Sequence, residues 1–268
     1  MRLLLKLRAN SSDKISFNYN YSLSAAIYKL LQFGSPEFST FLHDKGYVSN
    51  NKTYKLFTFG LQLEKTSSNN KFLKLESPNA YLYISSPLVD DFIKNFVIGT
   101  FENQKIEIFS EGLKTKFNIV TSEIIPEPMF KSEMKFKMIT PMVLSSQIQF
   151  NGKLNTYYYR VEDDIENINK IFNQNLINKY ETIYKKSYEG NGLKLTWDYD
   201  YLLKASKENK KLTKKVSIMK DYESPIEIIG MFCPFKLKGD VELIKVGYEA
   251  GFGSQNAMGF GLVYEESK

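Results

Sequence analysis

A glycine-rich run near the end of the chain, residues 247–261, constrains the fold more than any other stretch of these 268 residues. Five of the fifteen glycines fall inside it, and an apolar segment, residues 262–264, follows at once. Glycine adopts backbone conformations that a side chain forbids, so this density indicates unusual main-chain geometry or the close approach of a ligand. A simple turn before a terminal strand is the alternative, because glycine commonly marks turns.

The surroundings of the run indicate what kind of ligand it would face. It lacks the Gly-Lys-Ser/Thr ending of a Walker loop, and a dinucleotide-binding loop leads from a strand into a helix, whereas here a predicted helix from Asp240 enters and a strand leaves. Exposed amides in such a loop can bind anions, and the net charge of +6 suits a polyanion. We therefore expect a large phosphate-bearing ligand at Gly251, Gly253, Ser254, Gln255, Asn256, Gly259 and Gly261.

The composition excludes several classes of protein. The lone cysteine, Cys233, rules out a disulfide framework, and with the lone histidine, His43, it rules out a Cys/His zinc site. Cys233 lies in an apolar run and is predicted to be a buried hydrophobic residue. We expect no metal and no other cofactor. No apolar stretch approaches the ~20 residues that span a bilayer, and no signal-peptide pattern opens the chain, which predicts a cytoplasmic protein away from membranes.

Apolar periodicity predicts the order of elements in the first half of the chain. A strand at 2–8 precedes two helices, at 21–33 and from Pro36 to about Gly46. The later elements are strands at 54–64, 71–76 and 80–85, a helix from Pro87 to Gly99, and strands at 105–109 and 115–121. This order matches the βαββαβ plan of a ferredoxin-like domain.

The stiff segment Ile-Pro-Glu-Pro at 125–128 predicts a boundary between two domains, 1–125 and 126–268. The second half is expected to repeat the βαββαβ plan without a sequence repeat. Its predicted elements are a strand at 134–144, a long helix at 163–184, strands at 215–222 and 226–236, the helix from Asp240 and the terminal strand. The predicted fold class is therefore α+β, with tandem ferredoxin-like domains and a C-terminal glycine-rich loop.

Candidate catalytic residues gather in one segment of the first half. Tyr28 and His43 lie off the apolar faces of their predicted helices, so both are expected to face a cleft or solvent. With Lys52 and Lys55 they offer a group that titrates near neutrality, a phenol and a fixed positive charge. Metal-free RNA cleavage needs these groups, because the ribose 2′-OH attacks the adjacent phosphate with acid, base and cation assistance. A solitary surface histidine without function is the alternative.

A second basic feature lies between residues 204 and 215 and includes Lys210, Lys211 and Lys214. It is predicted to be either an arm that contacts RNA phosphates or a solvated loop. Neutralising phosphates releases counterions, so the first interpretation predicts strongly salt-dependent binding.

Four segments together resemble a known family. They are the glycine-rich run, Ala-Ile-Tyr-Lys-Leu-Leu at 26–31, Phe-Leu-His-Asp-Lys-Gly at 41–46, and the strand at 136–144. They look like the CRISPR-associated repeat-processing endoribonucleases, the Cas-six family of the RAMP superfamily, and the resemblance runs over nearly the whole chain. It implies tandem ferredoxin-like domains and metal-independent cleavage of the repeat in precursor CRISPR RNA. The implied products carry a 2′,3′-cyclic phosphate and a 5′-hydroxyl, and the crRNA passes to an effector complex.

The resemblance also assigns roles to individual residues. His43 matches the catalytic histidine, Tyr28 the tyrosine that some members use with it, and Lys52 the lysine, with Lys55 in reserve. Tyrosine, with a pKa near ~10, is a poor base unless a nearby cation lowers its pKa. Tyr28 is therefore expected to bind the phosphate or the 2′-OH, and the role of base stays open as the alternative.

Two other interpretations remain open. Some members only bind RNA, so a non-catalytic repeat-RNA scaffold is the main alternative, and a structural subunit that uses the glycine run for protein contacts is another. The expected partners are CRISPR repeat RNA or precursor crRNA and an effector complex, with the protein a monomer or a homodimer.

Overall fold

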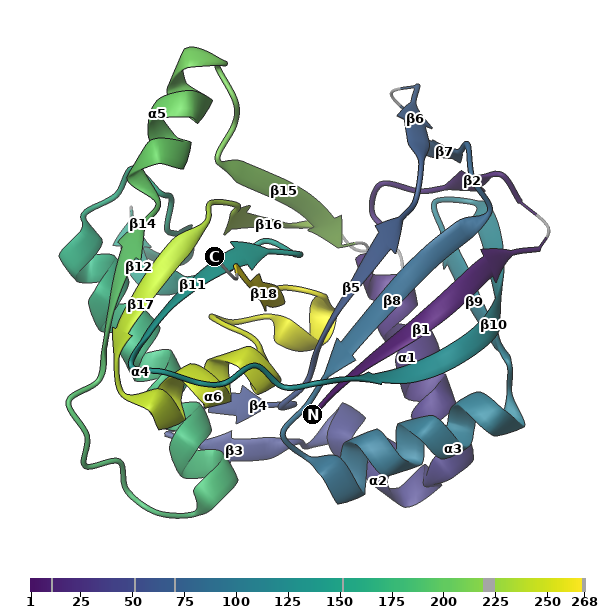
Figure 1. Cartoon of the computed structure of the whole chain (residues 1–268), viewed down its shortest axis with the longest axis horizontal. Coiled ribbons are helices and arrows are strands. Elements are labelled where there is room, and N and C mark those ends of the chain that lie inside the picture. The colour runs from purple at the N-terminus through teal and green to yellow at the C-terminus, as the bar shows by residue number, and fades with distance from the viewer. Residues whose placement is uncertain (11, 51, 70, 151, 219–224, 267–268) are drawn as a thin grey trace.

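The computed structural model describes the chain except residues 11, 51, 70, 151, 219–224 and 267–268. It is a mixed α/β protein in which each half of the chain builds its own antiparallel sheet and its own hydrophobic core (Figure 1). None of the helices in the described part of the chain is long and apolar enough to cross a membrane.

The first half forms a five-stranded sheet in the order β5-β8-β1-β10-β9. Its central strand is β1 (Arg2–Ala9), and β5 (Thr58–Leu63) and β9 (Lys105–Ser110) lie at the edges. β1 pairs antiparallel with both β8 (Asn79–Ser85) and β10 (Leu113–Ile125). Buried Leu, Ile and Phe side chains from alternate positions of these strands make the core of this half.

Three helices cover this sheet, as the apolar stripes predict. They are α1 (Asn20–Gly34), α2 (Pro36–Asp44) and α3 (Lys94–Glu102), with a short π-helical turn, η1 (Val89–Ile93), before α3. The hydroxyl of Ser35 accepts a hydrogen bond from the amide of Phe38, which caps α2 directly behind α1. The two helices therefore follow each other without a loop, and His43 falls in the last turn of α2.

The first half also contains several short strands outside its main sheet. β2 (Lys14–Ile15), β7 (Leu73–Leu75) and β6 (Thr66–Ser68) form a small sheet, and β3 (Tyr47–Ser49) and β4 (Lys52–Tyr54) form a hairpin. The single strand predicted at 54–64 is wrong: β4 and β5 are separate. Leu56 has a φ of 52°, which an extended strand does not allow, so the chain turns between them.

The second half forms a four-stranded sheet in the order β14-β17-β11-β18. These strands are β11 (Glu133–Met138), β14 (Leu193–Trp197), β17 (Phe235–Gly239) and β18 (Val263–Glu265). Two helices pack with them, α4 (Ile165–Tyr184) and α6 (Val241–Ala250), and the glycine-rich run links α6 to β18 through η2 (Asn256–Met258). Cys233 is fully buried, as predicted.

Of the two strands predicted at 215–222 and 226–236, only the end of the second joins the main sheet, as the start of β17. β15 (Thr213–Ile218) and β16 (Ile226–Met231) form a two-stranded sheet of their own, and Met231 at the end of β16 makes a single antiparallel bridge to Met142. Residues 219–222 of the first prediction lie outside the described residues. In the main sheet, the second and third strands of the predicted plan are β14, which was not predicted from the sequence, and β17. The predicted strand 134–144 ends at Met138, and β12 (Ser145–Phe150) and β13 (Lys153–Tyr158) form a further hairpin.

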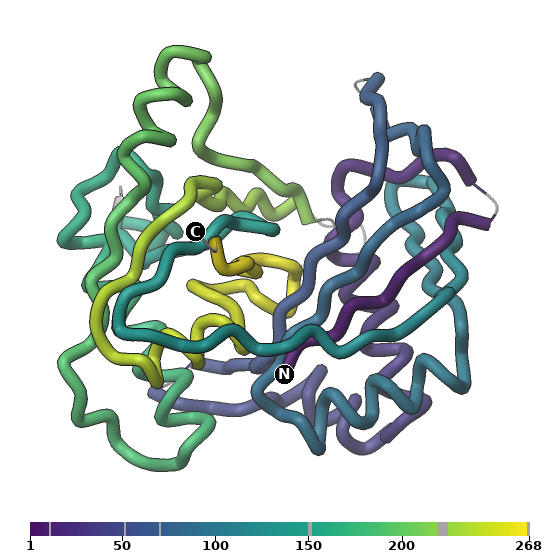
Figure 2. The backbone as a smooth tube through the Cα atoms, in the orientation of Figure 1, coloured from purple at the N-terminus to yellow at the C-terminus, as the bar shows by residue number. Residues whose placement is uncertain are grey.

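Contacts with the first half fix the position of the glycine-rich run. Arg2 in β1 is buried and donates to the carbonyl oxygens of Val263 and Tyr248. The hydroxyl of Thr58 donates to the Phe260 carbonyl at 2.8 Å, and the side-chain amide of Asn20 donates to the Met258 carbonyl at 2.9 Å. The run is therefore held against β5 and α1, between the two halves (Figure 2).

Candidate active site

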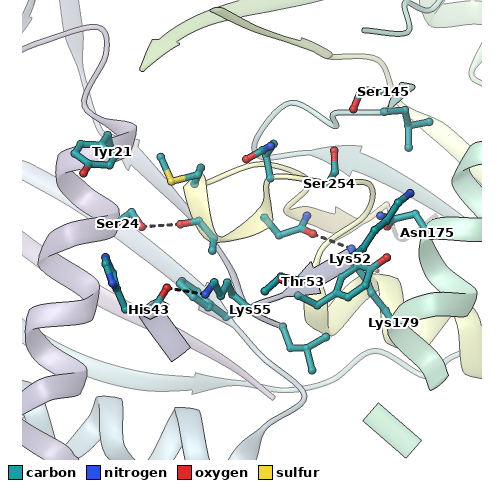
Figure 3. A pocket seen from close by; sticks show the side chains of 18 of the residues that line it. Tyr21, Ser24, His43, Lys52, Thr53, Lys55, Ser145, Asn175, Lys179 and Ser254 are labelled. Carbon is teal, nitrogen blue, oxygen red and sulfur yellow. Dashed lines mark hydrogen bonds between the residues drawn. The ribbon is translucent and has the colours of Figure 1, made fainter. Parts of the chain in front are cut away.

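An open cleft of about 930 Å³ lies where the two halves meet. One wall comes from α1 and the end of α2, and another from the β3–β4 hairpin and the segment that follows it. The remaining walls are α4, the start of β12 and the glycine-rich run (Figure 3). The cleft is therefore lined by segments that are far apart in the sequence.

His43 and Tyr28 lie together at one end of the cleft. The His43 side chain is 67% exposed, and its ring meets the Tyr28 ring edge to face, with the centroids 5.3 Å apart. Tyr28 is partly buried against the core of the first half, and this burial raises the pKa of its phenol. The phenol therefore stays protonated at neutral pH and can donate a hydrogen bond, which makes it a poor base.

Two charged residues surround His43. Its Nδ1 lies 2.8 Å from an Asp44 carboxylate oxygen, so an Nδ1–H can donate there and leave Nε2 free for a substrate. Lys55 lines the cleft, and its Nζ donates to the His43 backbone carbonyl at 2.7 Å (Figure 3). Partial burial lowers the pKa of Lys55, and the nearby Asp44 carboxylate opposes this effect.

Lys52 lies on the exposed hairpin across the cleft, and α4 holds that hairpin in place. The side-chain amide of Asn50 donates to the side-chain oxygen of Asn178 at 2.9 Å. Asn178 in turn donates to the Tyr54 hydroxyl at 3.1 Å, and Asn178 itself is only 2% exposed. The second half of the chain therefore positions a lysine that belongs to the first half.

The glycines of the C-terminal run lie beneath the surface of the cleft. Gly251, Gly253, Gly259 and Gly261 are all buried and all have φ between 72° and 87°. A Cβ on Gly261 would lie 1.9 Å from the Phe252 carbonyl oxygen. These residues must be glycine because of backbone conformation and close packing within the protein.

Five amides of this run are already used within the protein, and the predicted anion cradle stays a prediction for the others. The amides of Phe252, Ser254, Met258, Gly259 and Gly261 already donate to protein carbonyl oxygens. They are not available to a ligand, because each supports the fold of the run itself. Instead, the run presents the residues Ser254, Gln255, Asn256, Ala257 and Met258 to the cleft.

Lys179 on α4 holds the run from below. It is 1% exposed, and its Nζ donates to the carbonyls of Gly251 and Gly253, both at 2.6 Å, and to the Asn256 side-chain oxygen at 2.8 Å. Within the described residues, no carboxylate lies within 4 Å of this ammonium. Burial lowers its pKa to about 7, because the three acceptors named above are neutral and do not offset the cost of burying the charge.

Sequence reasoning missed Lys179 and its neighbour in the cleft, Asn175. Both occupy core-facing positions of α4, because Asn175 follows Phe172 by three residues and Lys179 follows it by seven. The sequence contained one signal for them, because both are polar residues at positions of an otherwise apolar stripe. The side-chain oxygen of Asn175 is buried and has no hydrogen-bond partner among the described residues.

The lysines between 204 and 215 lie away from this cleft. Lys204 lies on α5 (Tyr199–Lys207), so part of the segment predicted as a loop is helical. Lys210 follows the helix with its Nζ 5.2 Å from the centre of the Tyr201 ring, and Lys211 and Lys214 are exposed at and near the start of β15. Any contact of these lysines with a ligand would therefore require that ligand to extend beyond the cleft.

The chain matches two protein families along most of its length. Residues 125–264 match the family described as CRISPR associated protein Cas6, C-terminal, and residues 14–118 match CRISPR-associated protein Cas6, N-terminal. The chain is 32% identical to the CRISPR-associated endoribonuclease Cas6 1 of Methanocaldococcus jannaschii, over 98% of this chain and 92% of that protein. It is 26% identical to the CRISPR-associated endoribonuclease Cas6 of Pyrococcus furiosus, over 99% and 90%.

Solved structures show the same fold. A structure titled CRISPR associated protein Cas6 superposes with a TM-score of 0.74 at 28% identity, over 100% of this chain and 99% of that one. A RAMP protein described as binding different RNA substrates superposes with a TM-score of 0.79 at 20% identity, over 100% of both chains. The fold is thus that of RAMP proteins. The chain belongs to the CRISPR-associated Cas6 family, as the resemblance of its glycine-rich run and His43 segment predicts.

Proposed function

We propose that this protein is an endoribonuclease that cleaves CRISPR repeat RNA in precursor transcripts to give crRNA, without a metal ion. The observation that carries the proposal is the position of the chain's only histidine, exposed in a cleft beside Tyr28 and two lysines. The relatives named endoribonucleases, which match over nearly the whole chain, support it.

The reaction follows from the groups in the cleft. The ribose 2′-OH attacks the adjacent phosphate, its proton passes to a base, and the departing 5′ oxygen takes a proton from an acid. The products are a 2′,3′-cyclic phosphate and a 5′-hydroxyl. Nε2 of His43 is the group that exchanges a proton with the substrate, and the Asp44 carboxylate orients the ring through Nδ1.

The other residues bind and orient the RNA. The protonated Tyr28 donates to the phosphate or the 2′-OH, because burial raises its pKa and makes it a poor base. Lys52 places a positive charge at the phosphate, since Lys55 is already bonded to the His43 backbone. Ser254, Gln255 and Asn256 contact the strand from the opposite wall, and the four buried glycines shape the run that presents them.

We further propose that residues 1–125 and 126–268 are two domains, each built on the ferredoxin-like plan. In that plan the second, third, first and fourth strands lie side by side. The order β5-β8-β1-β10 in the first half follows this pattern, with β9 added at the edge. The order β14-β17-β11-β18 follows it in the second half, with hairpins inserted between the sheet strands.

The RNA extends from the cleft toward Lys210, Lys211 and Lys214, which contact its phosphates. The crRNA product then passes to an effector complex, and the protein acts as a monomer or a homodimer in the cytoplasm. Salt dependence of binding tests the lysine contacts, because each phosphate contact adds to the slope of affinity against salt concentration.

Cleavage of repeat RNA from the same genome in the presence of EDTA tests the proposed activity. Wild-type protein is expected to produce cyclic-phosphate and 5′-hydroxyl ends, and His43→Ala is expected to bind the RNA without cutting it. Binding without cleavage by the wild type would instead support the non-catalytic repeat-binding alternative, which the sequence left open.

A further inference from the structure

We propose that a second cleft, on the far side of α1, binds the single-stranded RNA that continues from the cleavage site. This inference rests on the proposed function, because it assumes that RNA occupies the first cleft. It assigns a role to a basic surface of the first half. This surface is separate from the candidate catalytic residues and from the glycine-rich run.

The second cleft is a neighbour of the first along α1. It has a volume of about 710 Å³ and lies between α1 and the edge of the sheet formed by β9 and β10. Tyr21 and Ala25, in the first two turns of α1, line both clefts. A strand leaving the His43 cleft past Tyr21 therefore enters the second cleft directly.

The second cleft carries a positive charge. Its described lining residues include three lysines, Lys29, Lys105 and Lys114, and one carboxylate, Glu107. Glu107 pairs with Lys114 at 3.3 Å and with Lys116 at 3.1 Å. In the described part of the chain, no carboxylate lies within 4 Å of Lys29 or Lys105, so both charges are available to phosphates.

Aromatic side chains lie among these lysines. Phe109 is 66% exposed and Tyr21 is 37% exposed, although both are large apolar groups that proteins usually cover. The Ser22 hydroxyl donates to the Phe109 carbonyl, so the end of β9 is fixed to the first turn of α1. The bases of single-stranded RNA stack on exposed aromatic side chains, and nearby lysines bind the phosphates of its backbone. The second cleft offers both kinds of group.

The test compares RNAs of different length that cannot be cut. Three repeat RNAs with a 2′-deoxy group at the scissile nucleotide are used: one spanning only the cleavage site, one extended toward the 5′ end and one toward the 3′ end. Fluorescence anisotropy gives Kd as a function of salt. Wild-type protein is expected to bind one extended RNA more tightly than the short one.

The variants identify the surface responsible. Lys29→Ala/Lys105→Ala is expected to weaken binding of that extended RNA roughly tenfold and to reduce the salt slope by about 1 to 1.5. Phe109→Leu is expected to weaken binding without changing the salt slope, since it removes stacking and no charge. Lys94→Ala/Lys194→Ala, which changes two exposed lysines outside both clefts, is the matched control and is expected to bind as the wild type does.

The outcomes separate this inference from the proposed function. If neither extension tightens binding, or if Lys29→Ala/Lys105→Ala binds all three RNAs as tightly as the wild type, the second cleft is not an RNA site. Cleavage by the wild type of the short RNA with its natural 2′-OH tests the first cleft alone. Failure of that cleavage overturns the proposed function, whereas normal cleavage with equal binding overturns only the second site.

Discussion

Replacing Gly261 with alanine tests whether close packing fixes the shape of the glycine-rich run. Gly261 has a φ of 76°, and an added Cβ would lie 1.9 Å from the Phe252 carbonyl oxygen. Gly112 has nearly the same φ, 77°, but a Cβ there would meet no atom of the described residues within 4 Å. Both variants place an alanine in a left-handed backbone conformation. The difference between their losses in free energy of unfolding therefore measures the cost of close packing alone.

The structure sets the expected magnitude of each change. The left-handed conformation costs an alanine about 1 kcal/mol at either position. At Gly261 the Phe252 carbonyl must also move, because real Cβ contacts are essentially never under 3.0 Å. This displacement adds about 1–3 kcal/mol of overpacking and about 1 kcal/mol for the Phe252 amide bond to the Gly261 carbonyl, which is 2.9 Å long. The predicted losses are about 3–5 kcal/mol for Gly261→Ala and about 1 kcal/mol for Gly112→Ala.

Urea unfolding measures both losses, and the Kd for repeat RNA measured on folded protein reports the functional consequence. Gly261→Ala is expected to weaken RNA binding, since Ser254, Gln255 and Asn256 lose their support, whereas Gly112→Ala leaves binding unchanged. Equal losses of stability in the two variants, or normal RNA binding by Gly261→Ala, would refute the argument that packing shapes the site.

Three further predictions concern the residues around the cleft. Because burial lowers the pKa of Lys179 to about 7 from 10.5, the unfolded chain binds more protons than the native one between these values. The free energy of unfolding of the wild type, relative to Lys179→Met, should therefore rise with pH above about 7; a pH-independent difference in urea unfolding would contradict it. Asp44→Ala should slow single-turnover cleavage roughly tenfold without weakening RNA binding, because His43 loses its orienting partner; an unchanged rate would exclude this role. Asn178→Ala should lower the free energy of unfolding by about 2 kcal/mol and slow cleavage more than it weakens binding, because the Lys52 hairpin loses its anchor; a Kd effect alone would contradict this.

The sequence predicted those parts of the fold whose signals are local. The apolar stripe of α1 and the Ser35-Pro36 start of α2 determine where Tyr28 and His43 lie, and both patterns are visible within a few residues. The two side chains fall together in the cleft because consecutive helices join without a loop. The family resemblance was equally accessible, since it depends on short motifs.

The remaining parts depend on contacts between distant segments. The pairing of β14 with β17 is set by tertiary structure, and a short alternating segment such as 193–197 does not reveal its partner. Lys179 lies 72 residues before Gly251, so its role as the anchor of the run required the structure. The second cleft is likewise invisible in sequence, because it joins one face of α1 to an edge strand.

Single-turnover cleavage of the genome's own repeat RNA in EDTA, by the wild type and by His43→Ala, tests the central claim most directly. The wild type is expected to cut at one position and leave a 2′,3′-cyclic phosphate and a 5′-hydroxyl. His43→Ala is expected to cut about 100-fold more slowly or worse while its Kd stays unchanged. A variant that cuts at the wild-type rate, or a wild type that cuts only when Mg²⁺ is restored, would contradict the account.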